Sequence, residues 1–329
     1  MMRQLIEDFP SQLDKAYSNA DNTSLVFTGE QFTNLIICGL GGSGIGGKIA
    51  AQLIQDEAKV PVFICNDYTL PGFVGTKSLV IISSYSGNTE ETVSAMEQAI
   101  KAKAVVASIT SGGAVLLLSE QHGLNCIEIP GGQPPRSQFG YSIVSLFRLL
   151  VHYQIISNDW WEQVSGLGTF LQSVHSTVVS RATSIADAIG NKIPAIYAEV
   201  RLEGVITRWR QQINENSKML CWHHVYPEMN HNEIVGWEGG SSDIIVLMLK
   251  SGDDHPRSAM RMNITKQLYE KKGATVVEIE DRGNNRLQRV MFFVTLGDWV
   301  SLLLAEKHGV DPVSIVSIDF LKNELSKHS

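Results

Sequence analysis

A loop rich in hydroxyl side chains, residues 83–92 (SSYSGNTEET), could bind a phosphate group. It follows an apolar segment typical of a buried strand and precedes a predicted helix, so Ser84, Ser86 and Thr89 would lie near a helix amino terminus. That end presents unpaired backbone N–H groups and the positive pole of the helix dipole. Alternatively, Ser86 or Asn88 only caps the helix, and Glu91 completes a capping box. Capping needs one hydroxyl and the loop supplies several, which favours an anion site.

A glycine-rich loop, residues 39–44 (GLGGSG), also lies between a strand-like segment and a predicted helix. It satisfies the G-x-G-x-x-G fingerprint of dinucleotide-binding folds, and Asp67 lies roughly 20 residues further on, near the expected place of a ribose-binding acid. A tight turn without a ligand would account for the glycines equally well. A dinucleotide fold has no use for the hydroxyl loop, so the two loops together favour a phosphorylated small molecule.

Three further residues could transfer protons or stabilise charge. Glu215 lies near the end of a predicted helix, where it is either a general base or a solvated glutamate paired with Lys218. His231 lies in a polar loop (NHNE), and histidine exchanges protons near neutral pH. Arg136 ends a Pro-Pro-Arg turn, where its guanidinium either faces a developing oxyanion or is solvent-exposed. The local sequence alone favours the solvated alternative for Glu215 and Arg136.

The elements that must position these residues alternate between strands and helices. Strand-like segments occur at 33–40, 60–65, 78–84, 104–110 and 124–130, and again at 194–198, 243–249 and 274–279. They are continuous Val/Ile/Leu runs, which indicate burial on both faces and hence parallel sheets flanked by helices. Such sheets bind ligands at the carboxyl ends of their strands. The segment SNDWW at 157–161 predicts a junction between domains 1–156 and 157–329, with a last helix from DPVSI to Ser329.

Composition and charge narrow the class of protein. Hydrophobic residues make up 43% and charged residues 19% of the 329 positions, which is typical of globular domains with sizeable cores. The net charge is −7 with no basic tail, which argues against nucleic acid and membrane as partners. The longest uninterrupted apolar runs are too short to span a bilayer, and the amino-terminal segment is not a signal peptide. Four scattered cysteines without CxxC spacing predict free thiols, and we expect a cytoplasmic protein.

The motifs resemble a known family. GGSG after the first strand and SYSGNTEET after the third resemble the sugar isomerase (SIS) domain, a phosphosugar-binding flavodoxin-like fold. Residues 209–218 (WRQQINENSK) and 227–233 (PEMNHNE) resemble the bifunctional phosphoglucose/phosphomannose isomerase family, as do 134–136 (PPR) and 318–322 (IDFLK). The N-E-N-x-K and N-H-N-E motifs are more specific than SYSGNT alone. The resemblance covers nearly the whole chain and implies two SIS domains, each a mainly parallel sheet flanked by helices.

The resemblance also implies a reaction and its residues. The chain would interconvert glucose 6-phosphate, and mannose 6-phosphate, with fructose 6-phosphate through an enediol, as a homodimeric enzyme of carbohydrate metabolism. Glu215 would be the base and Arg136 would face the enediolate oxygens. His231 would open the sugar ring from the partner subunit, and Lys322 would contact the phosphosugar.

The phosphate group and the dimer follow from the same resemblance. The expected phosphate-binding residues are Gly41, Gly42, Ser43, Ser84, Ser86 and Thr89. A twofold dimer would have two active sites that each combine residues of both chains. Its interface is expected to bury Trp222 and Trp237, which are costly to expose in a loop.

Other functions remain open at this point. His223, His224 and His231 lie close together in sequence, but the chain has no HExxH spacing, and we expect neither a metal nor a cofactor. A non-catalytic SIS protein that senses sugar phosphates is one alternative. A nicotinamide-dependent oxidoreductase that uses the glycine loop is the other. Isomerisation of fructose 6-phosphate without added metal or nucleotide would separate the three hypotheses.

Overall fold

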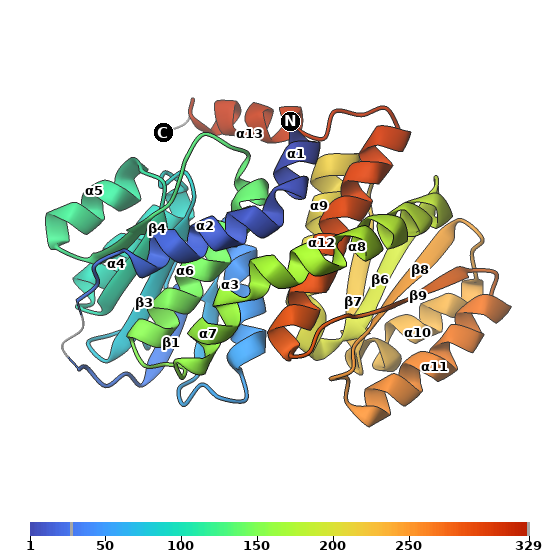
Figure 1. Ribbon diagram of the computed structural model, residues 1–329, viewed down its shortest axis with the longest axis horizontal. Coiled ribbons are helices and arrows are strands. Elements are labelled where there is room, and N and C mark those ends of the chain that lie inside the picture. The colour runs from blue at the N-terminus through green and yellow to red at the C-terminus, as the bar shows by residue number, and fades with distance from the viewer. Residues whose placement is uncertain (27–28, 328–329) are drawn as a thin grey trace.

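Two parallel β-sheets form the framework of the protein, whose computed structural model describes residues 1–26 and 29–327 (Figure 1). The first sheet has the order β2-β1-β3-β4-β5 and the second the order β7-β6-β8-β9. The strands are β1 (Asn34–Cys38), β2 (Val62–Cys65), β3 (Ser78–Ser84), β4 (Val105–Thr110), β5 (Asn125–Glu128), β6 (Ile193–Glu199), β7 (Trp222–Tyr226), β8 (Ile244–Lys250) and β9 (Thr275–Glu280). Strand pairing is parallel throughout the described residues, which confirms the predicted α/β class.

Helices flank both sheets. In the first part of the chain they are α1 (Met2–Glu7), α2 (Phe9–Asp21), α3 (Gly41–Ile54), α4 (Glu90–Lys101), α5 (Gly113–His122), α6 (Phe139–His152) and α7 (Asp159–Ser165). In the second part they are α8 (Leu167–Ile189), α9 (Glu203–Ser217), α10 (Glu233–Gly236), α11 (Pro256–Lys271), α12 (Arg286–Lys307) and α13 (Val316–Leu325). Short 3₁₀ helices are η1 (Pro135–Gln138), η2 (Val200–Leu202), η3 (Glu228–His231) and η4 (Trp237–Gly239).

Successive side chains of each strand point alternately to an inner and an outer face of the sheet. In β1, Leu35 and Ile37 pack with α3 and α6, whereas Ile36 packs with α4 on the opposite face. The inner faces of both sheets contribute to one continuous hydrophobic core, which Ile196 and Leu247 join from the second sheet. Both faces are thus apolar, because successive side chains point to opposite sides of a buried parallel sheet. The two sheets are therefore joined through their helices rather than separated by a linker.

Close helix contacts form this seam, and Figure 1 shows α3, α9 and α12 between the two sheets. Gly204 in the first turn of α9 lies against α3, where an added Cβ would come within 2.8 Å of Ile49. Gly297 in α12 lies against Trp209 of α9, and an added Cβ there would come within 2.4 Å of the indole. The Trp209 Nε1 donates a hydrogen bond to the Phe293 carbonyl at 2.8 Å. Side chains at either glycine would push α9 away from its neighbours.

The helix α12 is apolar over most of its length, although its uninterrupted apolar runs are short. By length and composition it could cross a membrane, and it is the one such helix among the described residues. However, 83% of its most apolar 18-residue stretch is buried inside the protein. Its polar residue Asp298 is also buried and paired with Arg208. We conclude that α12 is the central helix of the core.

The strand β7 was not predicted from the sequence. It reads Trp-His-His-Val-Tyr, which is not a continuous apolar run, although it pairs with β6 along its whole length. We expected a dimer interface to bury Trp222 and Trp237, on the premise that both lie in a loop, and that premise is wrong for Trp222. Trp222 begins β7, and Trp237 is buried within its own subunit, where its Nε1 donates to the Tyr197 hydroxyl at 3.1 Å. Burial of Trp237 therefore requires no second chain.

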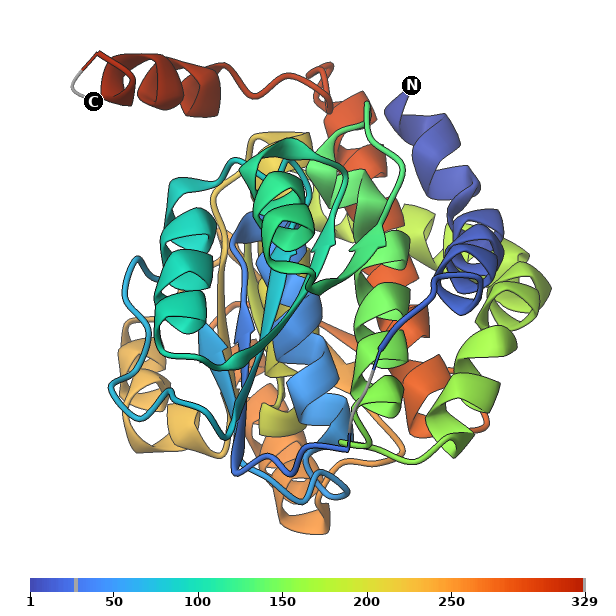
Figure 2. The ribbon, with the colours of Figure 1, turned by 90° about the vertical axis from the view of Figure 1, so that its left-hand side faces the viewer.

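The last helix, α13, lies apart from the body of the protein. It spans Val316–Leu325, whereas the predicted end at Ser329 lies outside the described residues. None of its residues is buried, and Figures 1 and 2 show it extending across the top of the first part of the chain, above the first sheet. Its apolar side chains Phe320 and Leu321 are more than half exposed, at 65% and 57%. The chain thus returns from the second sheet to the first at its carboxyl terminus.

Candidate active site

The hydroxyl loop joins β3 to α4 at the carboxyl edge of the first sheet. Gly87 has a φ of 68°, and a Cβ there would overlap the Gly112 carbonyl, so only glycine fits. Thr89 is the N-cap of α4 but makes no side-chain capping bond, and the capping box expected as the simpler alternative does not form. The Ser84 hydroxyl donates to the Thr89 Oγ1 at 3.4 Å, and the Ser86 Oγ accepts from the Asn88 N–H at 3.3 Å. The hydroxyl groups therefore lie together at the helix terminus without capping it.

The glycine loop lies beside the hydroxyl loop. Ser43 in the first turn of α3 accepts from the Tyr85 N–H at 3.0 Å, and its carbonyl accepts from the Ser83 hydroxyl at 3.2 Å. Gly41 begins the helix with a φ of 52°. Gly42 lies against the backbone of Arg136, where a Cβ would be 3.1 Å from the arginine Cα. The missing side chain thus allows η1, which carries Arg136, to approach the amino terminus of α3.

Arg136 of η1 and Glu215 of α9 meet at this edge, although η1 follows the first sheet and α9 connects strands of the second. The Arg136 Nη1 lies 3.3 Å from the Glu215 Oε2, and its Nε donates to the Asn216 Oδ1 at 2.7 Å. The remaining Nη2 donates to the carbonyls of Pro312 and Val313. The Arg136 side chain is 4% exposed and that of Glu215 is 28% exposed. Burial lowers the pKa of the Arg136 guanidinium, an effect that the neighbouring Glu215 carboxylate opposes.

A buried ion pair supports Arg136 from behind. Arg208 in α9 donates to the Asp298 Oδ2 at 2.7 Å and to the Arg136 carbonyl at 3.2 Å. Gln212, one turn further along α9, donates to the other Asp298 oxygen at 2.8 Å. The Arg208 guanidinium also lies 4.3 Å from the centre of the Phe139 ring. Burial raises the pKa of Asp298, which Arg208 and Gln212 oppose. The backbone of η1 is thereby fixed to α9 and α12.

Removing this buried pair should destabilise the fold. Asp298→Asn leaves the Arg208 guanidinium buried without its counter-charge, so we expect the free energy of unfolding to fall by about 3 kcal/mol. The matched control is Asp187→Asn, which removes the exposed ion pair with Lys307 and should cost less than about 1 kcal/mol. Urea unfolding followed by circular dichroism measures both changes. Equal losses in the two variants would contradict the role assigned to the buried pair.

Lys322 in α13 reaches the hydroxyl loop from above. A cavity of about 520 Å³ lies between α13 and the start of α4, and Lys322, Ser86, Thr89 and Leu40 line it together. Ile318 and Leu325, on the same side of α13, line the cavity as well. The structure therefore brings together Lys322 and the expected phosphate-binding loop, which are far apart in the sequence. This arrangement could bind an anionic group between the lysine and the helix amino terminus.

His231 is not brought to the same place within one chain. Glu215 lies in the last turn of α9, before the amino end of β7, whereas exposed His231 ends η3 beyond the carboxyl end of that strand. The five residues of β7 span about 16 Å at about 3.3 Å per residue. The two candidate acid–base residues thus lie at opposite ends of the second sheet.

Lys218 is a neighbour of the site whose role the sequence did not indicate. The alternative prediction that it pairs with the Glu215 carboxylate is wrong, because that carboxylate faces Arg136. Instead, the Lys218 ammonium donates to the main-chain carbonyl of Glu215 at 2.5 Å and to that of Asp311 at 2.9 Å. Asn216 is buried and bonds both Arg136 and Ser301. Only the N-E-N-x-K spacing could have indicated these residues.

The histidines considered as metal ligands do not converge. His223 and His224 are consecutive in β7, so their side chains point to opposite faces of the sheet. The His223 Nε2 lies 3.2 Å from the Thr207 hydroxyl, and burial lowers the pKa of His223 to about 4. Within residues 1–26 and 29–327, no group of three or more His, Cys, Asp or Glu side chains is placed to bind a metal ion.

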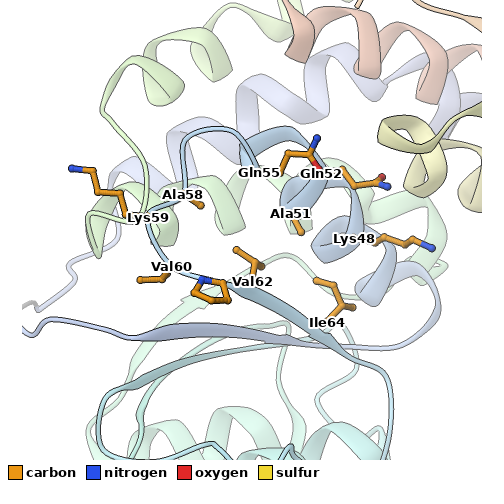
Figure 3. A pocket seen from close by; sticks show the side chains of 10 residues that line it. Lys48, Ala51, Gln52, Gln55, Ala58, Lys59, Val60, Val62 and Ile64 are labelled. Carbon is orange, nitrogen blue, oxygen red and sulfur yellow. The ribbon is translucent and has the colours of Figure 1, made fainter. Parts of the chain in front are cut away.

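A second hollow lies at the other edge of the first sheet. Figure 3 shows it between the end of α3 and the start of β2, lined by Ala58, Lys59 and Val60 among others. Two of its polar residues contact the second part of the chain: Lys48 pairs with Glu203, and Gln52 is bonded to α9 and η2. This hollow is remote from the carboxyl ends of the strands, where the candidate site lies.

Two parallel sheets, with phosphate-type loops at the carboxyl edge of the first, define a protein of the SIS class. Residues 178–325 match the bacterial phospho-glucose isomerase C-terminal SIS domain. Among solved structures, the C-terminal domain of glucosamine-fructose-6-phosphate aminotransferase from Francisella tularensis has the same fold, with a TM-score of 0.75 and 14% identity. That likeness covers 95% of this chain and 98% of the other.

The particular family follows from closer relatives. The bifunctional phosphoglucose/phosphomannose isomerase of Caldicellulosiruptor bescii is 38% identical over 336 aligned residues, which cover 99% of each chain. The protein of the same name from Aquifex aeolicus is 35% identical and covers 91% of this chain and 92% of its own. The chain belongs to the bifunctional phosphoglucose/phosphomannose isomerase family.

Proposed function

We propose that the chain interconverts glucose 6-phosphate and mannose 6-phosphate with fructose 6-phosphate at the edge where the first sheet meets α9. Its membership of the family supports the reaction. The observation that supports this location is the contact between Arg136 and Glu215, which joins a cation of the first part of the chain to a carboxylate of the second beside the glycine loop. A carboxylate and a guanidinium at this spacing suit proton transfer with stabilisation of the resulting charge.

The proposed reaction moves one proton between carbons 2 and 1 of the open-chain sugar and a second proton between the oxygens of the same two carbons, so that the carbonyl and hydroxyl groups exchange places. The phosphate binds to Ser86, Thr89 and the amino terminus of α4, with Lys322 above it and the loop 41–43 beside it. Glu215 removes the proton and returns it to the adjacent carbon. Arg136 stabilises the negative charge on the enediolate oxygens. These steps use only side chains and backbone groups of the protein, without a metal or a cofactor.

Ring opening is assigned to His231 of a second subunit. Because His231 lies at the far end of β7, it cannot act at the site that contains Glu215 of its own chain. His231 is exposed, so it can enter the site of a neighbouring subunit. We therefore propose a twofold homodimer with two sites, each combining Glu215 of one chain with His231 of the other. The topology of β7 supports this arrangement, since it separates the two residues in every subunit.

The domain boundaries and the location in the cell are also proposals. A division at residues 156 and 157 assigns the phosphate loops to an amino-terminal SIS domain, and Glu215 and His231 to a carboxy-terminal one. The four cysteines are free thiols, which supports a reducing cytoplasm as the location.

The decisive assay uses the purified protein with fructose 6-phosphate, no added metal and no nucleotide. We expect glucose 6-phosphate and mannose 6-phosphate to form, detected by chromatography of the sugar phosphates after the reaction is stopped. Binding of fructose 6-phosphate without turnover would favour a sensor, and binding of a nicotinamide nucleotide instead would favour an oxidoreductase. Either result would overturn the proposal.

The phosphate site makes a second prediction. The double variant Ser86→Ala/Thr89→Ala should raise both KM for fructose 6-phosphate and the inhibition constant of inorganic phosphate about tenfold, because both depend on the same donors. The control is Ser180→Ala/Thr183→Ala, which removes two exposed hydroxyls from α8 and should change neither constant. If phosphate inhibition is unaltered in the first variant, the phosphate does not bind to this loop.

A further inference from the structure

The segment between α12 and α13 presents three consecutive carbonyl groups to two cations. The Asp311 carbonyl accepts from the Lys218 ammonium at 2.9 Å. The carbonyls of Pro312 and Val313 accept from the Arg136 guanidinium. We call residues 311–313 the root segment, because α13 begins at Val316, shortly after it. Charged donors make stronger hydrogen bonds to carbonyls than neutral ones do, so this short stretch is fixed at a place where the chain has no regular secondary structure.

Lys218 is arranged for this contact at some conformational cost. It has a φ of 57° at the end of α9, in the left-handed region that residues with a Cβ seldom adopt. This backbone conformation places its ammonium on the last carbonyls of the helix, so that it also bonds the Glu215 carbonyl at 2.5 Å. Burial and the nearby Arg136 cation lower the pKa of Lys218. One side chain therefore joins the turn that carries Glu215 to the root segment.

The helix α13 has little else to fix its position. It has no buried residue, yet its Lys322 lines the cavity above Ser86 and Thr89. A ten-residue helix is only marginally stable on its own in water. The place of Lys322 above the hydroxyl loop therefore depends on where α13 begins, and that point is set at residues 311–313.

We propose that Lys218 is a positioning residue of the isomerase: by bonding the carbonyls of Glu215 and Asp311, it fixes the base relative to the helix that places Lys322 over the phosphate. This inference rests on the proposed site. Lys218 touches no reacting atom in this scheme. Its neighbour Arg136 bonds the same root segment and faces Glu215, so the arginine has a second role that Lys218 does not share.

The test compares Lys218→Asn with Lys218→Arg. Asparagine tolerates the left-handed conformation but is too short to reach Asp311, whereas arginine keeps a cation of similar reach. We expect Lys218→Asn to lower kcat/KM for fructose 6-phosphate about tenfold, mainly through KM, and Lys218→Arg to restore most of it. In the absence of substrate, backbone amides of α13 should exchange hydrogen several-fold faster in Lys218→Asn than in the parent, while those of α12 remain unchanged.

Two outcomes would overturn the inference. One is unchanged exchange in α13 when Lys218 is replaced by Asn. The other is faster exchange in α12 as well, because that would indicate general destabilisation rather than loss of the root contact. The exchange measurement needs no turnover, so it is independent of the proposed chemistry. If Lys322→Gln leaves KM unchanged while α13 exchanges faster in Lys218→Asn, the proposed phosphate site fails and the positioning of α13 stands.

Discussion

Glu215→Gln is expected to lower kcat for fructose 6-phosphate by about 10²-fold or more while substrate binding persists. The substitution keeps the size and polarity of the side chain but removes the proton acceptor. The glutamine oxygen can still accept from the Arg136 Nη1, which lies 3.3 Å from the carboxylate in the parent, so the turn should keep its shape. Steady-state kinetics and calorimetric titration with fructose 6-phosphate measure the two effects separately.

The control for this prediction is an identical substitution at a glutamate outside the site. Glu162→Gln changes an exposed residue of α7 and should leave both kcat and binding unchanged. Solvent hydrogen exchange at the sugar carbon gives a second readout, because loss of the base should abolish label incorporation into the substrate. Turnover of Glu215→Gln near that of the parent would show that another group transfers the proton.

Mixing two inactive chains should restore activity if the sites are shared between subunits. A Glu215→Gln chain and a His231→Ala chain each lack one group at both sites of their own homodimers. In a mixed dimer, one site receives Glu215 from one chain and His231 from the other, while the second site receives neither. Random exchange of equal amounts should therefore recover about a quarter of the parent activity. The structural reason is that β7 separates the two residues within each chain.

Demonstrated subunit exchange is the necessary control. Chains with distinguishable tags should co-purify after mixing, and each variant mixed with its own tagged copy should stay inactive. Recovery in the hetero-mixture alone would support shared sites. Co-purification without recovered activity would show that each subunit uses its own residues, and the assignment of His231 would then be wrong.

Much of the fold could be predicted from residue patterns, because buried parallel strands leave continuous apolar runs. The strand predicted at residues 78–84 begins and ends at the same residues as β3, Ser78–Ser84. The strand β7 escaped prediction because Trp222 and two histidines replace the aliphatic run, although its pairing with β6 is complete. Hydrophobic periodicity does not predict such a strand, because its polar side chains are stabilised by hydrogen bonds to residues distant in sequence. Examples are the bonds of His223 to Thr207 and of Trp222 to Glu233.

The site was less accessible to prediction from the sequence. The hydroxyl and glycine loops were identified because their residue types suit phosphate, and both lie at one sheet edge. The contact between Arg136 and Glu215 joins residues 79 positions apart, which only the packing of α9 against the first domain brings together. The N-E-N-x-K motif includes Lys218 but does not indicate its contact with residue 311, because Lys218 bonds a main-chain carbonyl that any residue there would supply. The roles of these residues in the reaction stay predictions until the variants are measured.

The seam between the two sheets has a consequence for the timing of catalysis. The helices α3, α9 and α12 bury apolar side chains from both sheets in one core, and Gly204 and Gly297 allow close contacts between these helices. The two sheets therefore cannot move apart during a catalytic cycle without opening that core. Arg136 and Glu215 are therefore aligned when the protein folds rather than when sugar arrives. Entry of the phosphosugar then involves elements at the surface of the site, of which α13 has no buried residue and lines the cavity above Ser86 and Thr89.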